Sequence, residues 1–160
     1  MAYSIDKTKS KIAEIKQKLE SKKSEMANLE YKKRELIEAG MEVQGSKLDE
    51  HTQGTLMDSI SQSLDANAKR GQELSKEMGE NLKNLEEHRQ ETQESIESNQ
   101  KTMASMERKK AALDKFGLGS AMDKGLSALQ ENRKDLAEVE KELADTQKSI
   151  FDLSAKASML

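Results

Sequence analysis

Hydrophobic residues near the start of the chain recur at alternating steps of three and four, the spacing that places them along one stripe of an α-helix. Ser4 is suited to cap this helix, and Asp6 falls where the helix dipole favours a negative charge. Gly40 and Gly45 follow the stripe, so the pattern predicts a helix over residues 5–39 and a turn at these glycines. The stripe, with its polar interruptions, is Ile5, Thr8, Ile12, Ile15, Leu19, Lys22, Met26, Leu29, Lys33 and Leu36.

A second and longer stripe predicts one very long helix over residues 47–115. Its start, Ser46-Lys47-Leu48-Asp49, matches a capping box. An additional step of four between Met78 and Leu82 is a stutter, which unwinds a coiled coil locally without breaking the helix. The stripe is Met57, Ile60, Leu64, Asn67, Gly71, Leu74, Met78, Leu82, Leu85, Arg89, Thr92, Ile96, Asn99, Met103, Met106, Lys110 and Leu113.

The glycine-rich segment KFGLGSAMDKGL, residues 115–126, raises the question of a phosphate-binding loop. A dinucleotide fingerprint would need a glycine where Met122 stands, and a P-loop would need Gly-Lys followed by Ser or Thr. Both motifs also follow a β-strand, whereas the preceding residues predict a helix. Gly117 is suited to the left-handed residue that ends a helix. The sequence therefore predicts a turn between two helices over Phe116, Gly117 and Gly119.

A third stripe predicts a helix over residues 120–158, again with a capping-box start at Ser120. Its members are Met122, Leu126, Leu129, Arg133, Leu136, Val139, Leu143, Ile150 and Leu153.

These three stripes predict an all-α fold in a single domain of residues 1–160. The first and third helices are each roughly half as long as the second, so both fit antiparallel along it as an elongated coiled coil of helical hairpins. The alternative is a four-helix bundle, which forms if the long helix breaks near Gly71–Gly79. The absence of a loop signal at these glycines favours three helices.

Composition narrows the classes of function. Aromatic residues make up 2 % and charged residues 36 % of the chain, a balance typical of long helices that meet along narrow stripes. The absence of cysteine excludes disulfides and cysteine-based metal sites. No apolar run is long enough for a transmembrane segment, and the first residues lack the apolar core of a secretory signal. We therefore expect a cytoplasmic protein, or one secreted without a cleaved signal peptide.

No arrangement of residues predicts an active site. His51 and His88 are the only histidines. The position three before His88 is Leu85 and not the glutamate of metal sites in helical bundles, so we expect both histidines to be solvated. Basic clusters such as Lys32-Lys33-Arg34 alternate with acids and lack stacking aromatics, which argues against nucleic acid as a partner. The sequence predicts no enzymatic activity, no bound metal and no other cofactor.

The second stripe points to a protein partner. Methionines adapt to imperfect contacts and are frequent on binding surfaces, although they also fill internal gaps. Polar stripe residues such as Asn67 and Asn99 lower stability while fixing register or partner choice. These features predict an adaptor or chaperone-like protein that binds another helical protein or itself; the alternative is a structural coiled-coil spacer or self-assembling scaffold. The residues predicted to contact the partner are Met78, Leu82, Leu85, Ile96, Met103 and Met106.

Two short motifs add a resemblance to a known family. Phe116-Gly117-Leu118-Gly119 lies at the predicted turn, and Tyr31-Lys32-Lys33-Arg34-Glu35 reads Y-x-x-x-E. With the lack of cysteine and proline, these motifs loosely resemble small helical proteins of type VII secretion systems, namely the WXG100-like proteins and the helical partners of LXG-type effectors. The turn lacks the family's tryptophan, and the tyrosine motif lies in the first helix instead of after the second. The resemblance implies binding to a helical effector or partner for export, without catalysis.

Overall fold

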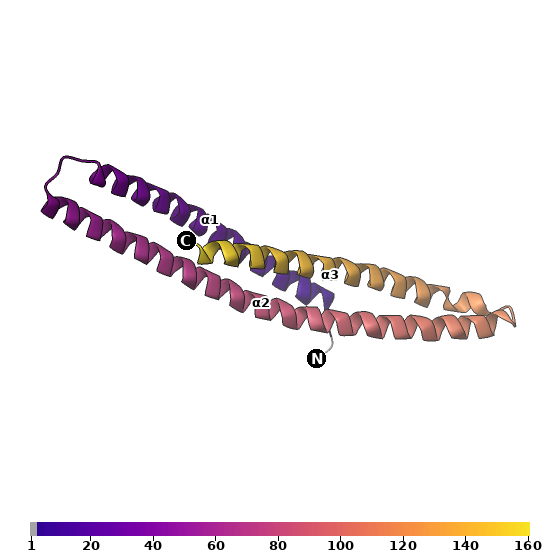
Figure 1. Cartoon of the computed structure of the whole chain (residues 1–160). Helices are drawn as coiled ribbons and strands as arrows, with labels where there is room; N and C mark the ends of the chain where they lie inside the picture. The colour runs from indigo at the N-terminus through magenta and orange to yellow at the C-terminus, as the bar shows by residue number, and fades with distance from the viewer. Residues whose placement is uncertain (1–2) are drawn as a thin grey trace. The chain divides into compact units, whose positions relative to one another are not determined.

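The computed structural model describes residues 3–160, and these residues form three long α-helices that pack antiparallel, without a β-strand among them (Figure 1). Helix α1 spans Ile5–Gln44, α2 spans Glu50–Asp114 and α3 spans Asp123–Ser158. A short 3-10 helix, η1, spans Gly119–Met122 immediately before α3. The prediction of an all-α fold with three helices is confirmed.

Helix α2 is continuous over 65 residues, so the alternative of a four-helix bundle with a break near Gly71–Gly79 is wrong. Each of these glycines weakens a helix by about 1 kcal/mol relative to alanine. Leu74 and Met78 lie between them and are completely buried. Burial of this face stabilises the helix more than the glycines weaken it, because tertiary packing outweighs intrinsic propensity in most protein helices.

Helix α1 continues to Gln44, beyond the predicted end at residue 39, and Gly40 is a helical residue instead of part of a turn. Gly40 is buried, and a Cβ atom built on it would lie 3.6 Å from the Cε atom of Met57 on α2. Gly40 therefore lies in the contact between α1 and α2, where a Cβ atom would make an ordinary van der Waals contact with Met57. Of the two glycines predicted to form this turn, only Gly45 lies in it.

The turn between α1 and α2 is capped on both sides. The Ser46 hydroxyl donates to the Val43 carbonyl at the end of α1, at 2.6 Å. The Asp49 carboxylate accepts from the backbone N–H of Thr52 at 3.2 Å and from the Thr52 hydroxyl at 2.7 Å. Helix α2 therefore begins after Asp49, and the predicted start at residue 47 with Ser46 as its cap is wrong. An aspartate at the cap also complements the helix dipole, which a serine does not.

The predicted turn between α2 and α3 is confirmed, and its backbone requires a glycine. Gly117 has a φ angle of 73°, in the left-handed region. The Leu118 N–H donates to the Leu113 carbonyl at 3.0 Å, and the Gly117 N–H donates to the Asp114 carbonyl at 3.1 Å. These two hydrogen bonds form a Schellman motif, which satisfies carbonyls that the end of α2 would otherwise leave unpaired.

Helix α3 begins at Asp123 and not at the predicted residue 120, because η1 occupies the residues in between. Stripe residues of α1 and α2 are all buried or half-buried, as predicted. On α3 the prediction was less accurate. Arg133 is exposed, whereas Thr146 and Ala157 are buried and were not predicted.

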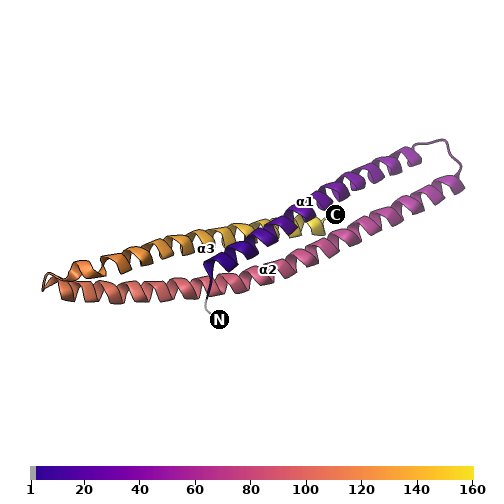
Figure 2. The same cartoon turned by 180° about the vertical axis from the view of Figure 1, so that it is seen from behind.

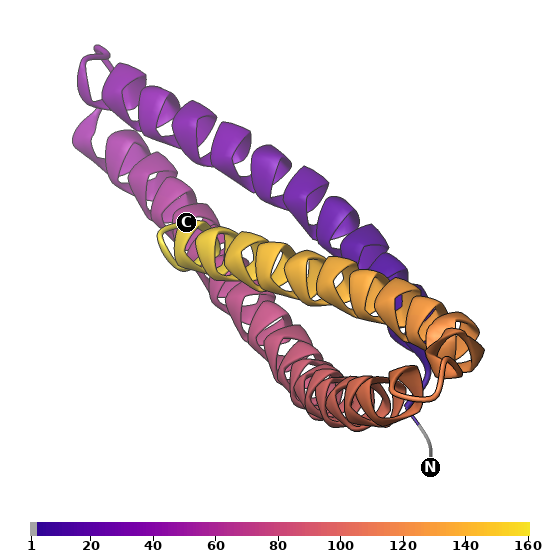
Figure 3. The same ribbon diagram turned by 90° about the vertical axis from the view of Figure 1, so that its right-hand side faces the viewer.

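The chain forms two compact units, each with parts of all three helices. Of the residues that the structure describes, unit 1 consists of residues 3–14 and 83–147, and unit 2 of residues 15–82 and 148–160. Figure 2 shows the α1–α2 hairpin of unit 2, and Figure 3 shows the turn from α2 to α3 in unit 1. The buried apolar residues of unit 2 are Ile15, Leu19, Met26, Leu74, Met78, Ile150 and Ala157. Those of unit 1 are Ile12, Leu85, Met103, Leu136, Val139 and Leu143.

Gly71 and Gly79 provide a matched test of packing in unit 2. A Cβ atom at Gly71 would lie 2.5 Å from the Ala157 carbonyl oxygen and 2.9 Å from the Leu160 Cβ atom, whereas a Cβ atom at Gly79 meets nothing within 4 Å. We expect Gly79→Ala to raise the free energy of unfolding by up to about 1 kcal/mol. We expect Gly71→Ala to lower it by roughly 1–3 kcal/mol, because the end of α3 must shift.

Urea denaturation of both variants measures this difference. Equal stabilisation by the two substitutions would show that the last turn of α3 does not pack on Gly71.

Candidate helix-binding surface

The six residues predicted to contact a partner fall into two groups. Met78, Leu85 and Met103 are buried inside the chain and fill its own core, so they are not available to a partner in this structure. Leu82, Ile96 and Met106 are half-buried and keep accessible surface. Contact between these three residues and a partner stays a prediction.

Unit 1 shows how a third helix changes the burial of the α2 stripe. The first turns of α1 lie against α2, and the Tyr3 and Thr92 hydroxyls share a hydrogen bond of 2.9 Å. Ile12 of α1 is buried, and Leu85 of α2 and Leu136 of α3 have 0 % of their surface exposed. Where three helices meet, the apolar stripe is therefore closed to solvent.

The rest of unit 1 is a hairpin of α2 and α3 alone, which runs to the turn between them (Figure 3). Asn99 and Met103 are buried in this hairpin, but several other stripe residues are only half-buried, since the described residues provide no third helix to cover them. Four of them form what we call the open α2–α3 face: Ile96, Met106, Leu126 and Leu129. Arg133 lies on the same stripe of α3 and is exposed. Arg133 is predicted as a polar member of the stripe, and in a hairpin of two helices this position stays open to solvent.

Specific contacts fix the geometry of this hairpin. The Asn99 side-chain amide donates to the Leu129 carbonyl at 3.1 Å, and a Cβ atom at Gly125 would overlap the Cε atom of Met106. The Lys110 ammonium lies 2.6 Å from the Asp123 carboxylate, whose hydrogen bond and charge raise the pKa of Lys110. The buried Oδ1 atom of Asn99 has no hydrogen-bond partner. A polar contact of this kind specifies one register between the helices at some cost in stability.

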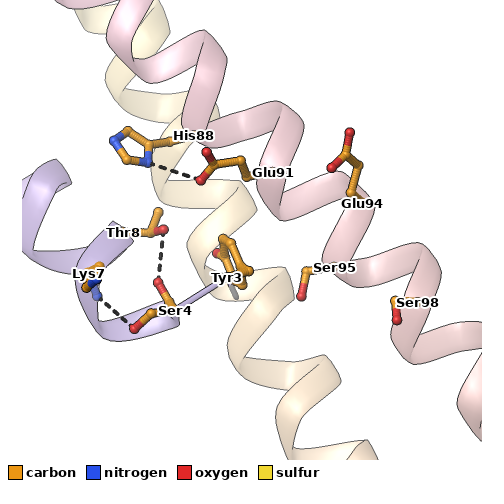
Figure 4. A pocket seen from close by; sticks show the side chains of 9 residues that line it. All are labelled: Tyr3, Ser4, Lys7, Thr8, His88, Glu91, Glu94, Ser95 and Ser98. Atoms are coloured by element: carbon orange, nitrogen blue, oxygen red, sulfur yellow. Dashed lines mark hydrogen bonds and ion pairs between the residues drawn. The ribbon is translucent and has the colours of Figure 1, made fainter. Parts of the chain in front are cut away.

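A groove of about 740 Å³ lies where α1 begins, between its first residues and α2 (Figure 4). The lining is polar and consists of Tyr3, Ser4, Lys7, Thr8, His88, Glu91, Glu94, Ser95 and Ser98. Among residues 3–160 no group of three or more side chains could hold a metal ion. The groove therefore offers hydrogen-bonding groups next to the uncovered part of α2.

His88 is the residue of this groove that sequence reasoning described incorrectly. It was expected to be solvated, but its side chain is only 25 % exposed and its Nδ1 atom lies 3.9 Å from the Glu91 carboxylate. Nδ1 is buried and makes no hydrogen bond. A histidine beside one carboxylate, with no nucleophile bonded to that nitrogen, lacks the mutual geometry of a catalytic site.

Unit 2 contains an ion-pair network that the sequence pattern did not reveal. The Arg70 Nη2 atom donates to Glu25 at 3.0 Å, and Nη1 donates to Glu73 at 3.2 Å and to Glu77 at 3.4 Å. Lys22 lies 3.4 Å from Glu77. The hydrogen bond from Arg70 lowers the pKa of Glu25. Arg70 of α2 binds Glu25 of α1 as well as acids of its own helix. The sequence does not indicate this pairing, because Glu25 and Arg70 are far apart in the chain.

Lowering the pH should destabilise unit 2, because protonation of the Glu25 carboxylate removes its ion pair with Arg70. A carboxyl whose pKa is lowered in the folded state stabilises the fold above its unfolded pKa, and this stabilisation disappears as the pH falls through the folded pKa. The effect is modest because the Arg70 and Glu25 side chains are 35 % and 39 % exposed, and solvent screens the pair. We expect the free energy of unfolding of the wild type to fall more between about pH 5 and pH 3 than that of Glu25→Gln.

Denaturant titrations at several pH values measure this difference. Glu20→Gln, which removes an exposed carboxylate of α1, is the control and should keep the wild-type pH dependence. A Glu25→Gln profile parallel to that of the wild type would contradict a stabilising ion pair with Arg70.

Comparison with known proteins does not assign the chain to a family, since no family model, curated protein or solved structure matches it. No helix within residues 3–160 is long and apolar enough to cross a membrane. The aromatic residue of each motif that resembles type VII secretion proteins is at the surface: Tyr31 is exposed on α1 and Phe116 is exposed in the turn. Glu35, one turn after Tyr31, raises the pKa of the tyrosine hydroxyl through a hydrogen bond and its negative charge.

Proposed function

We propose that the protein is a non-enzymatic adaptor or chaperone-like protein whose open α2–α3 face binds a helix of a partner protein. One observation carries this proposal: within unit 1 the pair of helices is closed to solvent where α1 covers it, whereas the four residues of the open α2–α3 face, beyond the start of α1, stay half-buried. Leu85 and Leu136 are completely buried, whereas Ile96 and Leu129 are not. Burying such apolar surface stabilises a complex by about 25 cal/mol per Å². A partner helix that packs on the open α2–α3 face, as α1 packs on the adjacent part of α2 and α3, would therefore bind favourably.

The covered section indicates what the partner helix should look like. Ile5, Thr8 and Ile12 of α1 follow a three–four spacing, and Thr8 and Ile12 are buried. A partner helix with branched or small apolar residues at this spacing would make equivalent contacts with the open α2–α3 face. The hydrogen bond between Asn99 and Leu129 holds the two helices in one register. The face is therefore preorganised, which lowers the entropic cost of binding.

A link to leaderless secretion of the type VII kind is part of this proposal. It rests on the exposed Tyr31-x-x-x-Glu35 motif and on the turn at Phe116–Gly119. The alternative function is a structural spacer or self-assembling scaffold, in which the open face of one copy meets another copy. The interrupted stripe favours the adaptor, since a spacer benefits from uniform heptads and unbroken supercoiling.

Affinity purification from the native host tests the adaptor proposal. We expect a helical protein to be retained by the wild type, and its retention to fall at least about tenfold with Ile96→Lys or Met106→Lys, because each places a charge in the contact. Gln90→Lys adds the same charge to an exposed position of α2 and should retain the partner. Circular dichroism of each variant checks that the helices remain folded.

Two outcomes would contradict the proposal. Equal retention by Ile96→Lys and Gln90→Lys would show that the open α2–α3 face is not the contact. Absence of any heterologous partner, together with assembly of the pure protein into higher oligomers that Ile96→Lys abolishes, would favour the scaffold.

A further inference from the structure

The turn between α2 and α3 presents two apolar side chains to solvent. Phe116 is 79 % exposed and Leu118 is 57 % exposed. They flank Gly117, whose φ angle of 73° and Schellman hydrogen bonds hold the backbone in one conformation. The two side chains are thus displayed by a fixed turn. We call residues 115–118 the α2–α3 tip.

The surroundings of the α2–α3 tip are basic. The last two turns of α2 and the first residues of α3, residues 108–124, contain five basic and two acidic side chains, which gives a net charge of +3. Lys110 and Asp123 pair with each other at 2.6 Å and do not change this balance. The other four basic residues are all exposed: Arg108, Lys109, Lys115 and Lys124.

The turn between α1 and α2 provides an internal comparison. The equivalent residues 38–51 contain four acidic side chains and one basic side chain, a net charge of −3 with His51 neutral. These residues also include exposed apolar side chains, with Met41 in the last turn of α1 at 67 % and Leu48 in the loop at 45 %. Exposed apolar residues therefore occur at both turns, but only the α2–α3 tip combines them with positive charge.

We propose that the α2–α3 tip docks on an anionic lipid surface. Phe116 and Leu118 enter the headgroup region, where an aromatic side chain is favourably placed, and the surrounding lysines and arginine approach the lipid phosphates. A lipid surface needs no complementary pocket, so it suits a convex tip with two projecting side chains better than a rigid protein surface does. The charge of +3 selects anionic over neutral lipid.

This contact differs from that of an amphipathic helix lying on a membrane. The stripe residues along the hairpin are buried, as Met103 is, or half-buried, as Leu126 and Leu129 are, whereas Phe116 and Leu118 at the turn are exposed. The hydrophobic contribution to lipid binding is therefore assigned to the turn. Loss of one aromatic side chain at the turn should have a large effect.

The absence of tryptophan from the chain allows a direct test with the full-length protein. Phe116→Trp places a single fluorophore at the α2–α3 tip, and Met41→Trp places one at the acidic turn. With vesicles of phosphatidylcholine containing about 30 % phosphatidylserine, we expect a blue shift and quenching by brominated lipids for Phe116→Trp only. Neutral phosphatidylcholine vesicles should bind at least about tenfold more weakly.

Co-sedimentation with the same vesicles measures binding without the fluorophore. We expect Phe116→Ser to reduce bound protein by about tenfold and Lys115→Glu to act in the same direction, while Met41→Ser leaves binding unchanged. Phe116 is so exposed that the substitution should not alter the circular dichroism spectrum. An unshifted emission of Phe116→Trp, or binding that Phe116→Ser and Met41→Ser affect equally, overturns the proposal and leaves a protein pocket as the alternative receptor for the tip.

Discussion

Packing on the apolar stripe of α2 is the interaction on which the other helices depend. The chain has few large apolar residues, so neither α1 nor α3 could bury its own stripe without a long helix beside it. In unit 2 the α2 residue Asn67 bonds to the Leu29 carbonyl of α1 at 3.2 Å, and Gly71 accepts the end of α3 at Ala157. In unit 1 Arg89 bonds to Gln147 of α3 at 2.8 Å. Polar and small residues of α2 thus set the registers while its apolar residues supply the burial.

Such narrow packing explains why binding surface remains. Two helices can shield only one face of each other, so a stripe that three helices would seal stays partly open in a two-helix hairpin. The open α2–α3 face follows from this geometry and needs no special sequence. In this chain the face contains the apolar residues Ile96 and Met106. Its two helices are held in register by buried polar groups such as Asn99. The proposed function and the proposed lipid contact at Phe116 use separate residues of unit 1.

Partner contact at the candidate site stays a prediction, and the structure shows only how accessible its residues are. Ile96 and Met106 keep accessible surface, whereas Met78, Leu85 and Met103, which the same reasoning included, are buried. Stripe position tells that a residue faces other helices, and it does not tell how many helices meet there. His88 shows the same limit, because it lines a groove together with Tyr3, which no local pattern connects to α2.

By itself the sequence determined the helical segments, the faces that α1 and α2 bury and the glycine turn at Gly117. Each of these follows from short-range rules, namely three–four periodicity and the left-handed conformation that glycine adopts without strain. Only the tertiary structure decided that α2 stays continuous past Gly71, that Gly40 lies inside α1, that Arg133 is exposed and that Arg70 pairs with Glu25. These outcomes depend on which residues of distant helices lie opposite each other. That register is fixed by the sum of many weak contacts between helices, which no local stretch of sequence contains.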